Sequence, residues 1–168
     1  SRTARQRGSQ SNSASIAVFI DRCKHAKHWS SALHVLRDAS RSLGEVSNYM
    51  LYNIAISACG RGREWQKALS LLWEMRYASS NPKISSFNAG MSACAQSEQW
   101  QQAVLLLDRT AEARLAPNTI SYNACLSACK NGAHWQAAVS LFRCLQDAGC
   151  EPDVVSCSSV VAACGRGG

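Results

Sequence analysis

Residues 121–142, SYNACLSACKNGAHWQAAVSLF, hold the pattern from which the fold can be inferred. An aromatic–Asn pair is followed by a turn of small residues with a cysteine, and then by a tryptophan that opens an apolar run. The same pattern stands at residues 52–73, YNIAISACGRGREWQKALSLLW, and at residues 87–107, FNAGMSACAQSEQWQQAVLLL. Such a recurrence predicts one small unit stacked on copies of itself rather than a single closed core.

Three residue types keep one period along the chain. Successive members are 35 residues apart, except for a first step of 36 in the cysteine and tryptophan series. The members are Cys23, Cys59, Cys94, Cys129 and Cys164; Trp29, Trp65, Trp100 and Trp135; and Pro82, Pro117 and Pro152. The period predicts a degenerate repeat at 13–48, repeats at 49–83, 84–118 and 119–153, and a truncated repeat, its first helix only, at 154–168. The composition of residues 1–12 predicts a disordered basic leader or linker. We interpret the chain as a fragment of a longer array.

Each unit is expected to form two helices. In the unit 119–153, Ser121 is the expected N-cap, and apolar residues follow at helical spacing. Gly132 should close this helix and Trp135 should open the second, with the tryptophans in the core rather than stacked on bases. Helices of about 10 to 13 residues cannot bury their apolar faces alone, so the prediction is an all-α fold, an α-solenoid of stacked repeats.

The net charge of +7 over 168 residues is unevenly placed. Residues 1–83 hold 13 Lys/Arg and 5 Asp/Glu, whereas residues 84–168 hold 5 and 6. Residues 1–12 carry three arginines and no acid, which fits the tail of an organelle transit peptide or a plain surface linker. Moderate positive charge suits a polyanionic partner. No apolar run approaches the ~20 residues that cross a bilayer, so no membrane partner is expected.

The nine cysteines indicate packing rather than disulfides or metal sites. Five occupy one repeat position, where cysteine serves as a small buried apolar residue, and we expect reduced thiols in a reducing compartment. Cys125 and Cys129 lack the short spacing of zinc ligands. The group of Cys23, His25 and His28 has no counterpart in other repeats. We expect no metal, no cofactor and no catalytic residues in this chain, and leave open an appended catalytic domain in a full-length protein.

The unit resembles the pentatricopeptide repeat. The resemblance rests on the openings YNIAISACGRG, FNAGMSACAQS and YNACLSACKNG and on the endings NPK, APN and EPD, and it covers residues 13–168. The tetratricopeptide repeat differs, with a 34-residue period and a tryptophan in its first helix. The resemblance, to the plant or algal organelle type, implies a right-handed superhelix that binds single-stranded RNA at one base per repeat.

By this resemblance, the fifth and last residues of each repeat read the base. These residues are Asn53 with Lys83, Asn88 with Asn118, Asn123 with Asp153, and Ser158. A side-chain amide offers a donor and an acceptor to a Watson–Crick edge. The resemblance implies uracil for the repeat 119–153, cytosine or uracil for 84–118, an open choice for 49–83, and a purine at Ser158. The alternative for each asparagine is a plain helix cap.

Two further sets are expected to contact RNA. The second residues of the repeats are expected to pack against bases, although a serine departs from the aliphatic pattern: Met50, Ser85, Ile120 and Val155. Basic residues near the ends of the first helices are candidate phosphate contacts: Arg61, Lys130 and Arg166. The alternatives are ordinary packing for the first set and solvated surface for the second.

The sequence therefore predicts a sequence-selective, pyrimidine-leaning binder of single-stranded RNA. It would act in organellar RNA processing, stability or translation, with other RNA-processing proteins as further partners, in the chloroplast or alternatively the mitochondrion. A protein-binding helical scaffold and the targeting module of a larger RNA-processing enzyme stay open as alternatives.

Overall fold

The computed structural model describes residues 45–77 and 81–167. These residues form helices and no strands. The helices are α3 (Glu45–Arg61), α4 (Trp65–Tyr77), α5 (Ile84–Gln96), α6 (Trp100–Glu112), α7 (Thr119–Asn131), α8 (Trp135–Asp147) and α9 (Val154–Gly167). The expected leader at 1–12, and the expected degenerate repeat at 13–48 up to the start of α3, lie outside the described residues.

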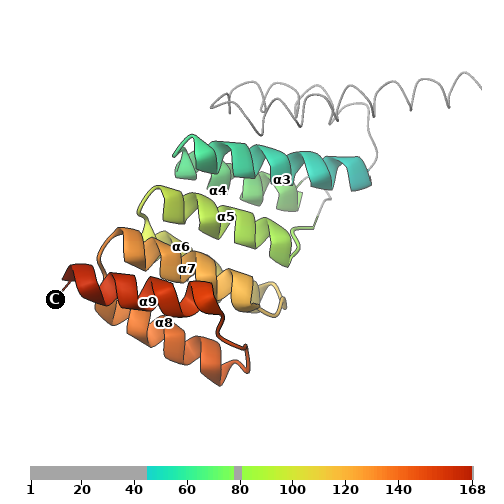
Figure 1. Ribbon diagram of the computed structural model, residues 1–168. Coiled ribbons are helices and arrows are strands. Elements are labelled where there is room, and N and C mark those ends of the chain that lie inside the picture. Colours follow the sequence, from blue (N-terminus) through green and yellow to red (C-terminus); the bar gives the residue numbers. More distant parts are fainter. Residues whose placement is uncertain (1–44, 78–80, 168) are drawn as a thin grey trace, which may run out of the picture.

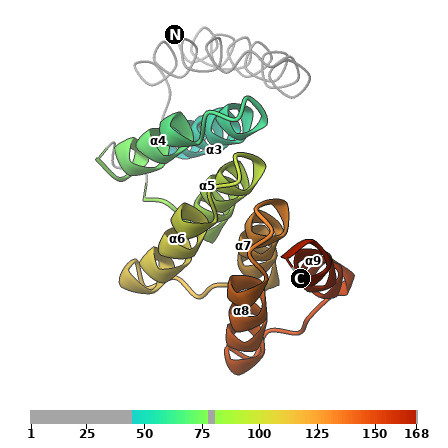
Figure 2. The same cartoon turned by 90° about the vertical axis from the view of Figure 1, so that its left-hand side faces the viewer.

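The helices stack as successive hairpins in two layers (Figures 1 and 2). One layer holds α3, α5, α7 and α9, each packed on the next, and the other holds α4, α6 and α8. The second helix of each hairpin packs against the first helix of its own hairpin and against the first helix of the next hairpin. The prediction of an all-α solenoid is confirmed.

The core is one continuous cluster that runs through the stack. The aromatic residues before the asparagines, Tyr52, Phe87 and Tyr122, are buried in it. The repeated alanines of the second helices, Ala68, Ala103 and Ala138, are fully buried. Small residues at these places let neighbouring helices approach closely, so each hairpin covers the apolar face of its neighbour.

Gly60 shows how closely the first layer is packed. A Cβ atom built on Gly60 would lie 2.9 Å from the Cβ of Ala93 on the next first helix. Real Cβ atoms do not come so near, and the obstacle is close to the backbone of α5. The glycine is therefore required by the contact between α3 and α5.

The start of α7 corrects the prediction for Ser121. The N-cap is Asn118, whose side chain accepts a bond from the backbone N–H of Ser121, while the Ser121 hydroxyl accepts from the backbone N–H of Asn118. This reciprocal arrangement is a capping box, with serine in its third helical position. The prediction was wrong because a serine can fill either place in such a box.

The first helix of the repeat 119–153 ends at the predicted residue, but the backbone there is not left-handed. Gly132 is the C-cap of α7, as expected, yet its φ is −89°. The left-handed residue is the next one, Ala133, with φ 56°, and Glu98 holds the same place after α5 with φ 61°. Gly149 is left-handed after α8. The repeat thus imposes the left-handed turn even where no glycine supplies it.

The tryptophans open α4, α6 and α8 as predicted, but they are not fully in the core. Trp65 and Trp100 are half-buried and pack against it, whereas Trp135 is 38% exposed. The ring of His134 covers Trp100 at a centroid distance of 4.9 Å. Among the described residues no ring covers Trp135 in the same way, and it is the most exposed of the three tryptophans.

The apolar face of α9 is open in the described part of the chain. Cys59, Cys94 and Cys129 are fully buried, but Cys164, at the same repeat position, is exposed. Val161 on the same helix is 71% exposed. The expectation of a buried cysteine is wrong for Cys164. In the other hairpins the second helix packs against the first helix of the same hairpin and covers the cysteine, and no described helix does this for α9.

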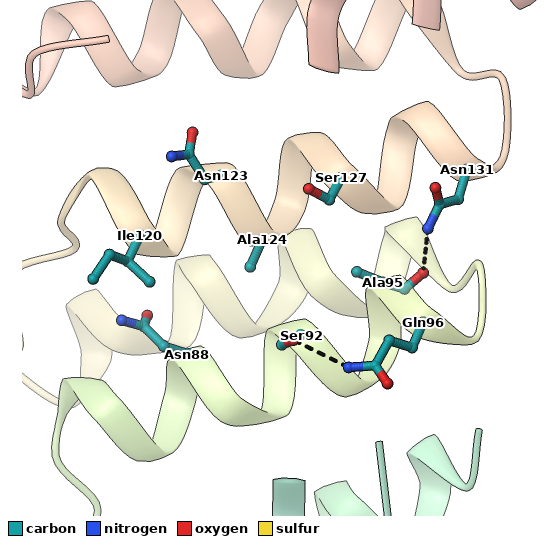
Figure 3. A pocket seen from close by; sticks show the side chains of 9 residues that line it. All are labelled: Asn88, Ser92, Ala95, Gln96, Ile120, Asn123, Ala124, Ser127 and Asn131. Atoms are coloured by element: carbon teal, nitrogen blue, oxygen red, sulfur yellow. Dashed lines mark hydrogen bonds between the residues drawn. The ribbon is translucent and has the colours of Figure 1, made fainter. Parts of the chain in front are cut away.

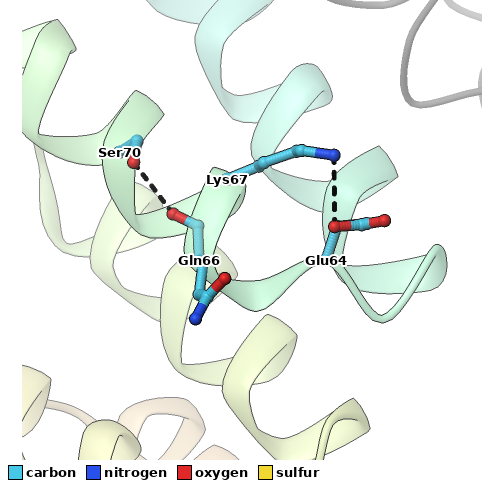
Figure 4. Close-up of polar contacts among 4 residues, drawn as sticks. All are labelled: Glu64, Gln66, Lys67 and Ser70. Atoms are coloured by element: carbon cyan, nitrogen blue, oxygen red, sulfur yellow. Dashed lines mark hydrogen bonds and ion pairs between the residues drawn. The ribbon is translucent and has the colours of Figure 1, made fainter.

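Polar residues contact one another at the start of α4 (Figure 4). Lys67 pairs with Glu64 at 3.3 Å, and the Ser70 hydroxyl donates to the carbonyl of Gln66 at 3.0 Å. Exposed pairs of this kind contribute little to stability. None of the described helices combines the length and apolar character of a bilayer-spanning segment.

Candidate nucleic-acid interface

The fifth residues of the repeats lie in register on successive first helices. Asn53 on α3, Asn88 on α5 and Asn123 on α7 are each half-buried. Asn88 and Asn123 line one groove of about 310 Å³, with Ile120 at the same end (Figure 3). The remaining walls are mixed: they hold the polar side chains of Ser92, Gln96, Ser127 and Asn131 together with the apolar Ala95 and Ala124. The repeat therefore places amides along one face at regular steps.

Asn123 is held between two partners. Its Nδ2 donates to both carboxylate oxygens of Asp153, at 3.0 and 2.9 Å. The hydroxyl of Ser156 donates to its Oδ1 at 2.6 Å. An ionised carboxylate only accepts hydrogen bonds, so the amide nitrogen must face Asp153 and the amide oxygen must face Ser156. The orientation of this amide is fixed by chemistry.

Asp153 is the acidic member of this site. The backbone N–H of Ser156 donates to it at 2.8 Å, and this bond, together with those from the side chain of Asn123, lowers the pKa of Asp153 from its ordinary value. Asp153 is exposed, so the carboxylate is ionised at neutral pH and open to a ligand.

Asn88 repeats the arrangement one unit earlier. Its Nδ2 donates to the Oδ1 of Asn118 at 3.3 Å, and its Oδ1 accepts from the hydroxyl of Ser121 at 2.7 Å. The Oδ1 of Asn118 also accepts from the backbone N–H of Ser121 at 3.1 Å. That N–H can only donate, so the oxygen of Asn118 faces the helix and its Nδ2 group takes no part in these bonds.

We call each set of three side chains a cap triad: Asn88, Asn118 and Ser121, and Asn123, Asp153 and Ser156. In both, the last residue of one repeat caps the next first helix and holds the asparagine of its own repeat. The serine is the third residue of the next repeat, and its hydroxyl donates to the Oδ1 of the asparagine. The predicted base-reading pairs are thus in direct contact in these two repeats.

The pair of Asn53 and Lys83 differs. Lys83 is the N-cap residue of α5 but makes no side-chain cap bond, because an ammonium group cannot accept one. Its Nζ lies 5.0 Å from the ring centre of Tyr49 instead. The Oδ1 of Asn53 and the hydroxyl of Ser86 are both buried without a hydrogen-bond partner. No cap triad forms, although Ser86 stands where Ser121 and Ser156 do.

The second residues of the repeats are exposed. Met50, Ile120 and Val155 are 55%, 62% and 49% exposed, which leaves apolar surface beside the asparagines. Ser85 is exposed and its hydroxyl is bonded to that of Tyr49. Ser158 is exposed, and its hydroxyl donates to the carbonyl of Val155 at 3.2 Å. The described residues hold no side-chain partner for Ser158 comparable to Asp153.

The three basic residues do not share one register. Arg61 and Arg166 stand 13 residues into their repeats, where Asn131 stands in the repeat 119–153, and Lys130 precedes that place by one residue. Asn131 donates to the carbonyl of Ala95 at 2.9 Å, and Arg166 donates to that of Lys130 at 3.2 Å. This place therefore links neighbouring first helices. Arg61 and Arg166 are exposed and Lys130 is half-buried.

The sequence analysis did not predict the bonds from the serines to the asparagines, and it did not point to Tyr49. Ser86, Ser121 and Ser156 recur with the 35-residue period, three residues after the last residue of each repeat. That spacing is the signature of a capping box and could have identified them. No pattern pointed to Tyr49, because the other repeats have Ile84, Thr119 and Val154 at its place. Within the described residues, no group of three or more His, Cys, Asp or Glu could hold a metal ion.

The fold and this row of amides define the class of protein: an α-solenoid of two-helix repeats with an amide-lined groove across its first helices. Three family models match the chain: the PPR repeat at residues 50–79, the pentatricopeptide repeat domain at 91–132 and the PPR repeat family at 117–166. Together they cover more than half of the sequence. The chain belongs to the pentatricopeptide repeat family.

Solved structures show the same fold. The PPR domain of Arabidopsis thaliana protein-only RNase P 1, in complex with tRNA, is 14% identical with a TM-score of 0.69, and the match covers 89% of this chain and 79% of that chain. PPR10 in complex with an 18-nt psaJ RNA element is 22% identical with a TM-score of 0.62. That match covers 81% of this chain and 25% of PPR10, so this chain spans about a quarter of that protein's length. No curated protein matches the sequence.

Proposed function

We propose that the chain binds single-stranded RNA and selects one base at each cap triad. The observation that supports this most directly is the pairing of Asn88 with Asn118 and of Asn123 with Asp153 on one face, one repeat apart. A single asparagine in this place could be an ordinary cap. Here the last residue makes the cap, and the asparagine is a further polar group that the helix start does not need.

The two triads offer different hydrogen-bonding edges. At Asn123 and Asp153, an amide nitrogen lies beside a carboxylate, so a donor stands next to an acceptor. Uracil complements this pair with its carbonyl oxygens and its N3–H. At Asn88 and Asn118, the oxygen of Asn118 is occupied and its nitrogen is left, so donors predominate. Cytosine complements donors with its O2 and N3 acceptors.

The apolar residues beside the amides support the same function. Ile120 lies at the groove end between Asn88 and Asn123, and its 62% exposure leaves a surface on which a base can pack. Met50 and Val155 hold the equivalent place in other repeats. Bases splayed from a single strand need such a surface in addition to edge contacts.

Binding to short labelled RNAs by fluorescence anisotropy tests the proposal. Oligonucleotides that differ at one position should show a preference for uracil at one site, and Asn123→Ala should abolish it, with about a tenfold loss of selectivity. Gln136→Ala, exposed on α8 in the other layer, is the matched control and should change nothing. If Asn123→Ala leaves the preference intact, this repeat does not read a base.

Salt dependence tests the contacts to the strand. The candidate phosphate contacts Arg61, Lys130 and Arg166 should make affinity fall as salt rises, because bound cations release counterions from the nucleic acid. An affinity that is flat with salt would contradict phosphate contacts. By family resemblance we also propose an organellar role in RNA processing, stability or translation, in the chloroplast or the mitochondrion.

A further inference from the structure

We infer that Ser121 and Ser156 are positioning residues: each sets the orientation in which the asparagine of the preceding repeat meets its base. The inference rests on the proposed function and extends it to a residue type that does not touch the base. Both serines are fully buried, so they cannot contact RNA themselves.

The hydrogen bonds of Ser156 show how the positioning works. Its hydroxyl oxygen accepts from the backbone N–H of Asp153 at 3.2 Å, and its single proton lies toward Asn123 Oδ1 at 2.6 Å, with Asp153 Oδ1 at 2.9 Å. Asn123 is therefore held at its oxygen by Ser156 and at its nitrogen by Asp153. An amide with two anchors has a fixed plane, whereas one with a single anchor can rotate about that bond.

Ser121 repeats these contacts at the other triad. It accepts from the backbone N–H of Asn118 at 3.2 Å and approaches Asn88 Oδ1 at 2.7 Å and Asn118 Oδ1 at 3.0 Å. The same four groups meet in the same order one repeat apart. Because the contacts recur, a chance rotamer of one serine does not explain the bonds between the serines and the asparagines.

The repeat 49–83 supplies a natural control. Ser86 is as buried as the other two serines, yet its hydroxyl and the oxygen of Asn53 have no hydrogen-bond partners. Two groups differ here: Lys83 cannot accept the bonds that Asn118 and Asp153 accept, and the Tyr49 hydroxyl lies beside the side chains of Asn53 and Ser86. A serine positions the asparagine only when the last residue of the repeat is an acceptor. Selectivity thus depends on three residues, contributed by two repeats.

Ser156→Ala tests the loss of the anchor. We expect selectivity for uracil to fall about fivefold at the nucleotide that Asn123 reads, identified as the position affected by Asn123→Ala. A merely structural serine would instead weaken all sequences equally. Ser86→Ala is the matched control, since its hydroxyl forms no hydrogen bond with the Oδ1 of Asn53, and should leave selectivity unchanged.

Lys83→Asp tests whether a triad can be created. It adds a hydrogen-bond acceptor beside Asn53 and leaves Ser86 in place. The new carboxylate should complete a triad with Asn53 and Ser86 and create a preference for uracil at one further nucleotide. The double variant Lys83→Asp with Ser86→Ala should lack most of that preference. Equal preference in the single and double variants would overturn the inference.

The failures of the two proposals are distinguishable. If the wild-type protein shows no base preference with any RNA, the proposed function fails and the positioning role falls with it. If the wild type and Asn123→Ala behave as proposed but Ser156→Ala matches the wild type in selectivity, only the inference is overturned. Circular dichroism establishes that each variant is folded, and the Lys83→Asp pair decides the matter if Ser156→Ala does not fold.

Discussion

At the scale of single residues, the two cap triads differ in one group. Asn118 and Asp153 occupy the same place, make the same bond to the next serine N–H, and receive the amide nitrogen of their own asparagine. One carries an amide nitrogen where the other carries a carboxylate oxygen. That single difference should decide which base is preferred.

Asp153→Asn tests this directly. The variant keeps the cap and the bond to Asn123 but replaces an acceptor by a donor, so preference should shift from uracil toward cytosine, by about five- to tenfold in the affinity ratio. Anisotropy titrations with RNAs that differ at this one position measure the ratio. The reciprocal change Asn118→Asp should shift its own site toward uracil, and an unchanged ratio in both would contradict the assignment.

The pKa of Asp153 gives a prediction for stability against pH. Because its folded pKa is below the ordinary value, the carboxylate stabilises the fold fully above the unfolded pKa of about 3.9, and this contribution is lost as pH falls through the lower folded value. Urea unfolding of the wild type should therefore lose stability below about pH 4 more steeply than that of Asp153→Asn. Parallel pH profiles of the two proteins would contradict the lowered pKa.

At the scale of helices and turns, the repeat dictates backbone conformation independently of local sequence. The residue after the C-cap is left-handed at Glu98, Ala133 and Arg114, and only Gly149 is a glycine. A side chain in that region costs about 1 kcal/mol. The stacked neighbours hold these turns in place, so packing prevails over local preference.

Ala133→Gly should therefore raise the free energy of unfolding by about 0.5–1 kcal/mol, since it removes a Cβ from a left-handed residue at φ 56°. Ala148→Gly is the matched control: its φ is −75°, so the change should lower stability by a few tenths to about 1 kcal/mol. Chemical denaturation measures both. Destabilisation by Ala133→Gly would show that its φ is not left-handed in solution.

At the scale of the whole molecule, the burial of each cysteine depends on which helices stack against its own. The four cysteines Cys59, Cys94, Cys125 and Cys129 are buried between helices. Burial raises the pKa of Cys59 to about 11 and that of Cys94 to about 12. Cys144, Cys157 and Cys164 are exposed on the last helices of the described chain.

Alkylation of the native protein with iodoacetamide should therefore label Cys144, Cys157 and Cys164 within minutes, because they are open to solvent and reagent. The four buried cysteines should react only after urea unfolds the stack. Peptide mass spectrometry reads out each site separately. Fast labelling of Cys94 in the folded protein would show that the central hairpins are not packed as described.

The sequence by itself determined the architecture. A 35-residue period in cysteine, tryptophan and proline specifies two helices and a turn, and repetition leaves stacking as the way to bury their apolar faces. It also located Asn88, Asn123 and their partners, because a periodic chain places equivalent residues on one face.

Only the tertiary structure decided what those residues do to one another. The N-cap of α7 is Asn118 rather than Ser121. The buried hydroxyl of Ser121 instead donates to Asn88, the asparagine of the preceding repeat. These bonds join residues 33 positions apart, and their existence depends on the approach of α5 to α7. The serine at this repeat position bonds to Asn123, but the equivalent Ser86 makes no bond to the oxygen of Asn53. In that repeat Lys83 offers no acceptor, and the Tyr49 hydroxyl lies beside both side chains.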